Sequence, residues 1–145
     1  MQAYQFSLEN IKFYGPTHFA PVLDVVSKFV AENINEKLYH ILLILTDGDI
    51  HDMSRTKDLI VAASSMPLSI IIVGIGEDEF EAMIELDGDE VILTNHSGVP
   101  TKRDIVQFVK YNDVKDMGEQ FLSEEVLQEV PEQIISYICQ NKIAS

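Results

Sequence analysis

The sequence predicts an α/β domain with a mostly parallel sheet flanked by helices, and three observations support this fold class. Helical and strand-like spacings of apolar residues alternate along the chain. Two short apolar runs, at residues 41–45 and 70–73, are each followed by a turn that contains glycine. The segments after these runs have helical periodicity, and a strand–helix–strand order favours parallel strands joined by right-handed crossovers.

The first expected elements are an amphipathic helix at residues 18–35 and a strand at residues 41–45. Pro21 is compatible with the helix because it falls in the first turn. The inward face consists of apolar residues at helical spacing, namely Phe19, Val22, Val26, Phe29 and Val30. Residues 41–45 are all apolar, so we expect a strand that is buried on both faces and ends at Thr46-Asp-Gly48.

A second helix is expected between the two strands, where Asp52 or Ser54 can cap its first turn and Pro67 ends it. Its apolar face consists of Leu59, Ile60, Ala62 and Ala63. Residues 69–73 are then a buried strand rich in β-branched residues. Residues 77–86 are expected to form a third helix whose inward residues are Phe80, Met83 and Ile84.

The remainder of the chain gives weaker signals. Residues 91–93 predict a short strand between two turns. Residues 103–109 alternate unevenly, which fits either a strand or an extended edge segment. Two further helices are expected at residues 119–129 and 131–141.

Composition and charge limit the classes of function. The 145 residues, of which 46% are apolar, suffice for a single hydrophobic core. The net charge of −14 repels phosphate backbones and anionic lipids, so we expect neither nucleic-acid binding nor unaided membrane docking. A single cysteine, Cys139, allows no disulfide within the chain, which favours the reducing cytoplasm.

Carboxylates follow the first apolar run, at the edge of the sheet where ligands bind in parallel α/β folds. Asp47 is placed at the carboxyl end of this strand, and Asp49 and Asp52 come just after it. Their oxygen atoms suit magnesium, manganese or calcium. The alternative is structural: Asp47 and Gly48 form a tight turn, and Asp52 caps a helix.

Two further observations bear on this loop. Thr17 ends a turn just before the first helix, where it can cap that helix, contact a metal ion, or do both. Asp47 and Asp49 also have the spacing of the nucleophile and acid of haloacid-dehalogenase-type phosphatases. However, His51 stands where that family usually has Thr or Val, and no downstream Lys and Asp pair is evident. A magnesium-dependent phosphatase or phosphotransferase is therefore the alternative function.

Five ordered blocks of the sequence resemble the copine family, over about residues 10–138. The blocks are Tyr14-Gly-Pro-Thr-His-Phe-Ala-Pro21, Leu43-Ile-Leu-Thr-Asp-Gly48, Ser69-Ile-Ile-Ile-Val-Gly-Ile-Gly76, Leu86-Asp-Gly-Asp89 and Arg103-Asp-Ile-Val-Gln-Phe-Val109. The resemblance implies a von Willebrand factor A-like (Rossmann-like) domain that recruits target proteins and is not an enzyme. It also implies a cytoplasmic protein whose C2 domains, absent from this chain, bind phospholipid membranes peripherally in a calcium-dependent way.

The resemblance further implies a metal-ion-dependent adhesion site, in which Thr17 and Asp47 match two of the ligands. The family's Asp-x-Ser-x-Ser loop, which follows the first strand of the domain, has no counterpart in this sequence. Residues 1–145 are therefore expected to be one domain truncated at its amino-terminal side. We expect magnesium or manganese in the complete domain and weak or no binding here, with Asp49, His51 and Asp52 as contributors from the loop.

Loss of the first strand has a structural consequence as well. It would leave residues 41–45 at a sheet edge, with unpaired backbone groups and an uncovered apolar face. We therefore expect two copies of the chain to pair or swap elements along this edge. Target proteins would bind at the face that carries the metal site.

Overall fold

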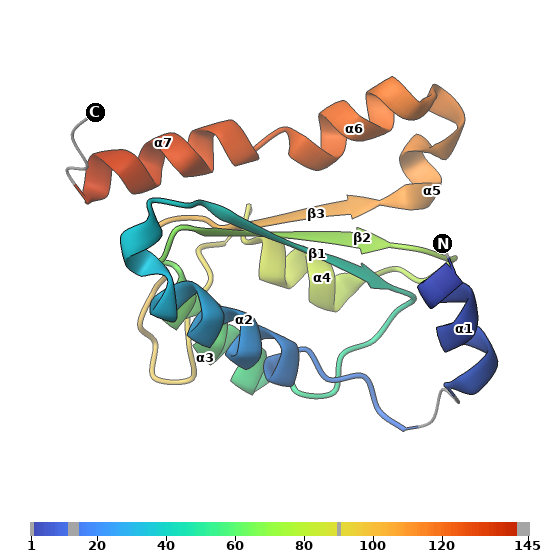
Figure 1. Ribbon diagram of the computed structural model, residues 1–145, viewed down its shortest axis with the longest axis horizontal. Helices are drawn as coiled ribbons and strands as arrows, with labels where there is room; N and C mark the ends of the chain where they lie inside the picture. The colour runs from blue at the N-terminus through green and yellow to red at the C-terminus, as the bar shows by residue number, and fades with distance from the viewer. Residues whose placement is uncertain (1, 12–14, 90, 142–145) are drawn as a thin grey trace.

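A computed structural model describes residues 2–11, 15–89 and 91–141 of the chain. Its centre is a sheet of three parallel strands in the order β1–β2–β3 (Figure 1). The strands are β1 (His40–Thr46), β2 (Leu68–Gly74) and β3 (Val106–Lys110). The fold is thus the expected α/β class with a parallel sheet flanked by helices.

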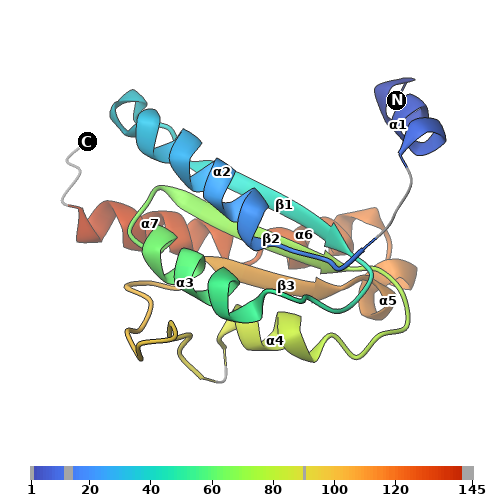
Figure 2. The ribbon, with the colours of Figure 1, turned by 90° about the horizontal axis from the view of Figure 1, so that it is seen from below.

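Helices cover both faces of the sheet, but unequally (Figures 1 and 2). On one face lie α2 (Ala20–Glu32), α3 (Met53–Ala63) and α4 (Glu81–Asp87). On the other face lie α6 (Glu119–Leu127) and α7 (Val130–Gln140). The remaining described elements are α1 (Gln2–Asn10), α5 (Tyr111–Val114) and the short 3-10 helices η1 (Ile34–Glu36) and η2 (Lys115–Met117), none of which the sequence patterns predicted.

The register of the strands brings their carboxyl ends to one rim. His40 lies opposite Leu68, and the pairing of β1 with β2 continues to Thr46 opposite Gly74. β2 pairs with β3 in the same direction, so that Gly74 also lies opposite Lys110. The loops that follow all three strands therefore start side by side, which is the arrangement that the candidate site requires.

The larger hydrophobic core lies between the sheet and α2, α3 and α4. Its fully buried members include Leu23, Val30, Ile60, Met83 and Leu86. A smaller cluster on the opposite face joins β2 to the two carboxyl-terminal helices through Ile71, Val73 and Val130. β2 is consequently buried along its whole length, as expected for a central strand with helices on both faces.

The expectation that residues 41–45 are buried on both faces is wrong. Leu42 and Ile44 pack into the core between the sheet and α2 and α3, whereas Ile41, Leu43 and Leu45 are 49%, 54% and 63% exposed. The reason is that α7 and α6 pack over β2 and β3, so no described helix covers the second face of β1. The expectation that these residues form a sheet edge with an uncovered apolar face is confirmed, since β1 pairs only with β2 among the described strands.

The expected helices form, but some of the residues that face the core differ from those predicted. Phe19 and Val30 are buried as predicted, but Val22 and Phe29 are exposed because α2 turns Ala20 and Leu23 toward the core instead. Ile84 of α4 is also exposed rather than inward. No described helix is long and apolar enough to cross a membrane.

The strand expected at residues 91–93 does not form. Val91 and Ile92 are 77% and 68% exposed, and the segment makes only an isolated antiparallel bridge between Thr94 and Pro100. None of the described strands pairs with this segment, so apolar composition alone is not enough to make a strand.

Residues 103–109 resolve into β3 preceded by a buried arginine. The guanidinium of Arg103 donates to the carbonyl oxygens of Met66, Leu68 (2.8 Å) and Gln133 (3.2 Å). It thereby ties the segment before β2 to α7, which explains why the apolar alternation of this segment is uneven. A charge is tolerated there because backbone carbonyls accept from both terminal nitrogens of the guanidinium, while its Nε has no partner among the described residues.

Candidate functional site

Three loops meet at the rim formed by the carboxyl ends of the strands. The carbonyl oxygen of Thr46, at the end of β1, accepts a hydrogen bond from the backbone N–H of Ile75 (2.7 Å). The carbonyl oxygen of Gly76, after β2, accepts one from the side-chain amide of Asn112, which follows β3 (2.6 Å). One backbone hydrogen bond and one from a side chain therefore join the three loops.

The turn that carries Thr17 is joined to the loop that carries Asp47. The backbone N–H of His51 donates to the carbonyl oxygen of Thr17 (2.9 Å), and the N–H of Thr17 donates to His51 Nδ1 (3.3 Å). Two predicted site residues, 34 positions apart, are thus in direct contact. The structure gives His51 a positioning role, since both of its hydrogen bonds go to the backbone of the turn.

Asp52 serves the protein backbone and not the rim. Its carboxylate accepts hydrogen bonds from the N–H groups of Phe19 (3.0 Å) and Ala20 (2.9 Å), at the amino end of α2, and from the hydroxyl of Thr56 (3.3 Å). Burial opposes ionisation, but these hydrogen bonds outweigh it and lower the pKa of the Asp52 carboxyl.

These contacts correct two capping expectations. Asp52 directly precedes α3, yet its carboxylate accepts from N–H groups at the start of α2 and from no N–H of α3. Thr17 does not cap α2. The residue at the N-cap position of this helix is Phe19, whose side chain makes no capping hydrogen bond. With its lone pairs committed to N–H and O–H donors, Asp52 is a poor candidate ligand.

Asp47, Asp49 and Thr17 are the predicted residues whose side chains stay uncommitted. Asp47 and Asp49 are exposed and Thr17 is half-buried, and none of these three side chains hydrogen-bonds to another described residue. Two carboxylates and a hydroxyl thus lie on the rim or on the turn bonded to it. Oxygen atoms of this kind are those that magnesium and manganese prefer.

The structure adds Asp78, which the sequence patterns did not select. Gly48 packs so closely against it that a Cβ on Gly48 would lie 2.5 Å from Asp78 Oδ2. The loop after β1 and the loop after β2 therefore bring a further carboxylate against Gly48, the residue that follows Asp47. Its position after β2 could have indicated this contact, because the loops that follow neighbouring parallel strands lie at the same rim of the sheet.

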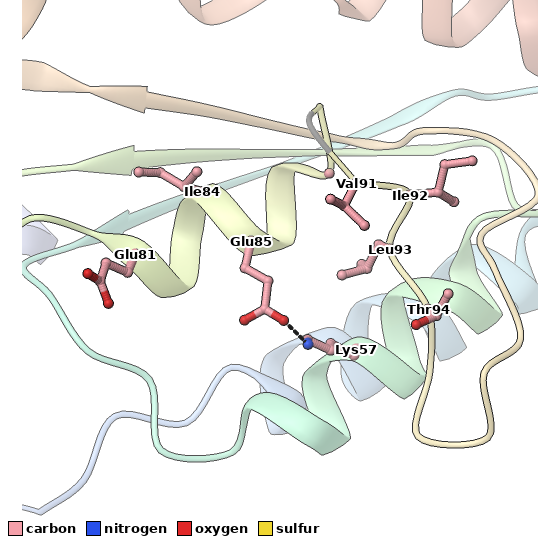
Figure 3. Close-up of a pocket in the computed structure, with 9 residues that line it drawn as sticks. Lys57, Glu81, Ile84, Glu85, Val91, Ile92, Leu93 and Thr94 are labelled. Atoms are coloured by element: carbon pink, nitrogen blue, oxygen red, sulfur yellow. Dashed lines mark hydrogen bonds and ion pairs between the residues drawn. The ribbon is translucent and has the colours of Figure 1, made fainter.

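Within the described ranges, no group of three or more His, Cys, Asp or Glu side chains is arranged to hold a metal ion. A pocket of about 440 Å3 opens elsewhere, between α4, Lys57 of α3 and the segment of residues 91–94 (Figure 3). Its walls are largely apolar, and its ion pair joins Lys57 to Glu85. None of the predicted site residues lines it.

A separate group of acids lies near the amino end of β3 and the start of α7. Desolvation by burial raises the pKa of the Asp87 carboxyl to about 7, and the nearby charges of Asp89 and Asp104 add to this. Burial and a hydrogen bond with Asp104 raise the pKa of Glu129 to about 8. Gln133 bridges the group by donating to Asp104 (3.3 Å) and Glu129 (3.2 Å).

A comparison with known protein families identifies one family for the chain. The copine family model matches residues 1–145. The matched range includes the rim loops, the turn that carries Thr17 and the acids near β3.

Proposed function

The chain belongs to the copine family, and we propose that it is a non-enzymatic protein-interaction module whose rim carries part of a metal-ion-dependent adhesion site. In this proposal, Thr17 and Asp47 contribute oxygen ligands to Mg2+ or Mn2+. An open coordination position of the ion accepts a carboxylate of the target protein. Family membership also supports, as part of the proposal, a cytoplasmic protein whose C2 domains bind membranes in a calcium-dependent way.

One observation carries the proposal: the turn of Thr17 and the loop of Asp47 are hydrogen-bonded to one another while both side chains keep free oxygen atoms. The loop stays in place because His51 and Asp52 anchor it on the turn and on α2. Anchored loops with uncommitted acids favour binding, because the ligands need little further ordering.

Two ligand side chains supply little charge, so we expect weak binding of the ion by this chain. Mn2+ titration followed by water proton relaxation measures it directly. Asp47→Asn and Thr17→Val are expected to weaken binding by about 5- to 10-fold. Asp116→Asn, which removes an exposed acid from η2, is the matched control and should leave binding unchanged. Equal affinity in wild type and Asp47→Asn would contradict the proposed site.

A phosphatase that uses Asp47 and Asp49 would behave differently. It would turn over p-nitrophenyl phosphate with Mg2+, and this turnover would vanish in Asp47→Asn. We expect no such turnover. Asp47 is a metal ligand in the proposed module and the nucleophile in the enzymatic alternative. The assay therefore distinguishes these two functions.

A further inference from the structure

A second candidate surface surrounds the pocket beside α4. This helix packs against β3, so the pocket lies on the side of the sheet away from β1 (Figure 2). Leu93 is buried in the pocket wall, whereas Ile84, Val91 and Ile92 line the pocket and are each at least half exposed (Figure 3). Exposed apolar side chains around a hollow, with charged residues at its margin, are typical of surfaces that bind other proteins.

Hydrogen bonds hold the loop that forms one wall of this pocket. The N–H of Thr101 donates to the carbonyl oxygen of Leu93 (3.0 Å). The backbone N–H and the Nδ1 atom of His96 both hydrogen-bond to the carboxylate of Asp58 on α3 (3.0 and 2.8 Å). Residues 91–94 are therefore fixed to the helical layer, and a ligand that enters the pocket has little ordering of the loop to oppose its binding.

The charge beside the pocket is strongly negative. Residues 77–89 include seven acids and no lysine or arginine. Glu81, Ile84 and Glu85 are three and four positions apart, so acidic and apolar side chains share one face of α4. Lys57 pairs with Glu85 across the pocket, whereas Glu81 is exposed and has no ion-pair partner among the described residues (Figure 3). An apolar pocket thus has a free carboxylate at its margin.

We propose that this surface binds a basic peptide segment of a partner protein. Apolar side chains of the segment fill the pocket against Ile84, Val91 and Ile92. A lysine or arginine beside them pairs with Glu81, and the other acids of residues 77–89 attract the segment over a longer distance. Apolar burial supplies most of the affinity in this complex, and charge selects the partner.

The same charge disfavours other occupants of the pocket. The acids repel ligands that carry phosphate, such as nucleic acids and anionic lipids. A second copy of the chain is disfavoured because each copy carries 24 acids against ten lysines and arginines. The inference is independent of the metal site, since neither Thr17 nor Asp47 lines the pocket.

Selection from a phage-displayed library of random peptides tests the surface. The whole chain is the bait, and peptides that also bind the Ile84→Asp variant are removed. We expect the remaining peptides to combine apolar residues with lysine or arginine, and a synthetic peptide of their consensus to bind with a dissociation constant of about 1 to 100 µM in fluorescence anisotropy. Raising NaCl from about 50 to about 500 mM should weaken this binding about 3- to 10-fold, whereas EDTA should leave it unchanged.

A charge exchange tests the role of Glu81. Glu81→Lys should weaken binding of the consensus peptide about 10-fold, and a peptide whose basic residues are changed to glutamate should bind this variant better than it binds wild type. Glu32→Lys and Ile135→Asp are the matched controls, because they change an exposed acid and an exposed apolar residue on other helices.

Both controls should bind the peptide within about 2-fold of wild type, and circular dichroism checks that every variant is folded. Three results would overturn the proposal: a selection that leaves no peptide, a consensus without basic residues, or a peptide whose binding is unaffected by Glu81→Lys. The second result would indicate an uncharged apolar ligand.

Discussion

Asp52 shows how one carboxylate can be withdrawn from a candidate site by its neighbours. It is one of the acids after β1, yet it points to the amino end of α2 and accepts hydrogen bonds from two backbone N–H groups there. Those N–H groups have no partner within the helix, and the helix dipole favours a negative charge beside them. Asp47, five residues earlier, has no such partner and stays available for a ligand.

Removal of this contact should lower stability. Asp52→Ala is expected to reduce the free energy of unfolding by about 1 to 2 kcal/mol in urea denaturation at pH 7. Because hydrogen bonds lower the pKa of Asp52 below 3.8, its contribution is present above that pH and is lost as the pH falls further. Asp49→Ala, with no hydrogen bond to lose, is the control. A loss in Asp52→Ala that is equally large at pH 2.5 would contradict the assigned role.

Between β2 and α4, a glycine and an aromatic ring determine how closely two elements approach. A Cβ on Gly74 would lie 2.8 Å from the ring of Phe80, which is itself 3% exposed. Phe80 has a left-handed backbone (φ 59°) and directly precedes α4. The residue therefore bends the chain at the start of the helix while its ring fills the space above Gly74, which explains why α4 begins later than its helical spacing predicted.

The contact makes Gly74 intolerant of any side chain. Gly74→Ala is expected to lower the free energy of unfolding by about 1 to 3 kcal/mol because of overpacking against the ring. Phe80→Leu is destabilising by itself, but it should remove most of the extra cost of the alanine. A double-mutant cycle from urea denaturation measures this coupling. Additive effects of the two substitutions would show that the ring does not limit the site.

For the whole molecule, the acids between α4, β3 and α7 link stability to pH. Asp87 accepts a hydrogen bond from the N–H of Phe108 (2.7 Å), so this carboxyl joins α4 to the sheet. The pKa values of Asp87 and Glu129 are raised to about 7 and about 8, chiefly by burial. The folded state therefore retains protons that the unfolded chain has already released above about pH 4 to 5.

Stability should accordingly fall as the pH rises from about 5 to about 8.5. Both carboxyls partly reach solvent, so we expect a decrease of only about 1 to 3 kcal/mol in the free energy of unfolding. Glu129→Gln should flatten the dependence, because the amide cannot ionise. Glu32→Gln, an exposed acid at the end of α2 on the other face of the sheet, is the control. A wild-type stability that rises across this range would refute the assignment.

The order of elements and the rim loop of Asp47 follow from local signals in the sequence. An apolar run that ends at Thr46-Asp-Gly48 specifies a strand and the turn after it, and this required no knowledge of distant residues. The five blocks that resemble copines likewise led to the family that the whole chain matches.

The tertiary structure decided which of these residues are free and which faces are covered. Thr17 meets His51, Asp52 turns to α2, and Asp78 joins Gly48 only because separate loops converge at one rim. The apolar composition of residues 41–45 and 91–93 is similar, yet one becomes a half-exposed strand and the other an exposed loop. Burial and pairing depend on which elements lie alongside, and the local sequence does not contain that information.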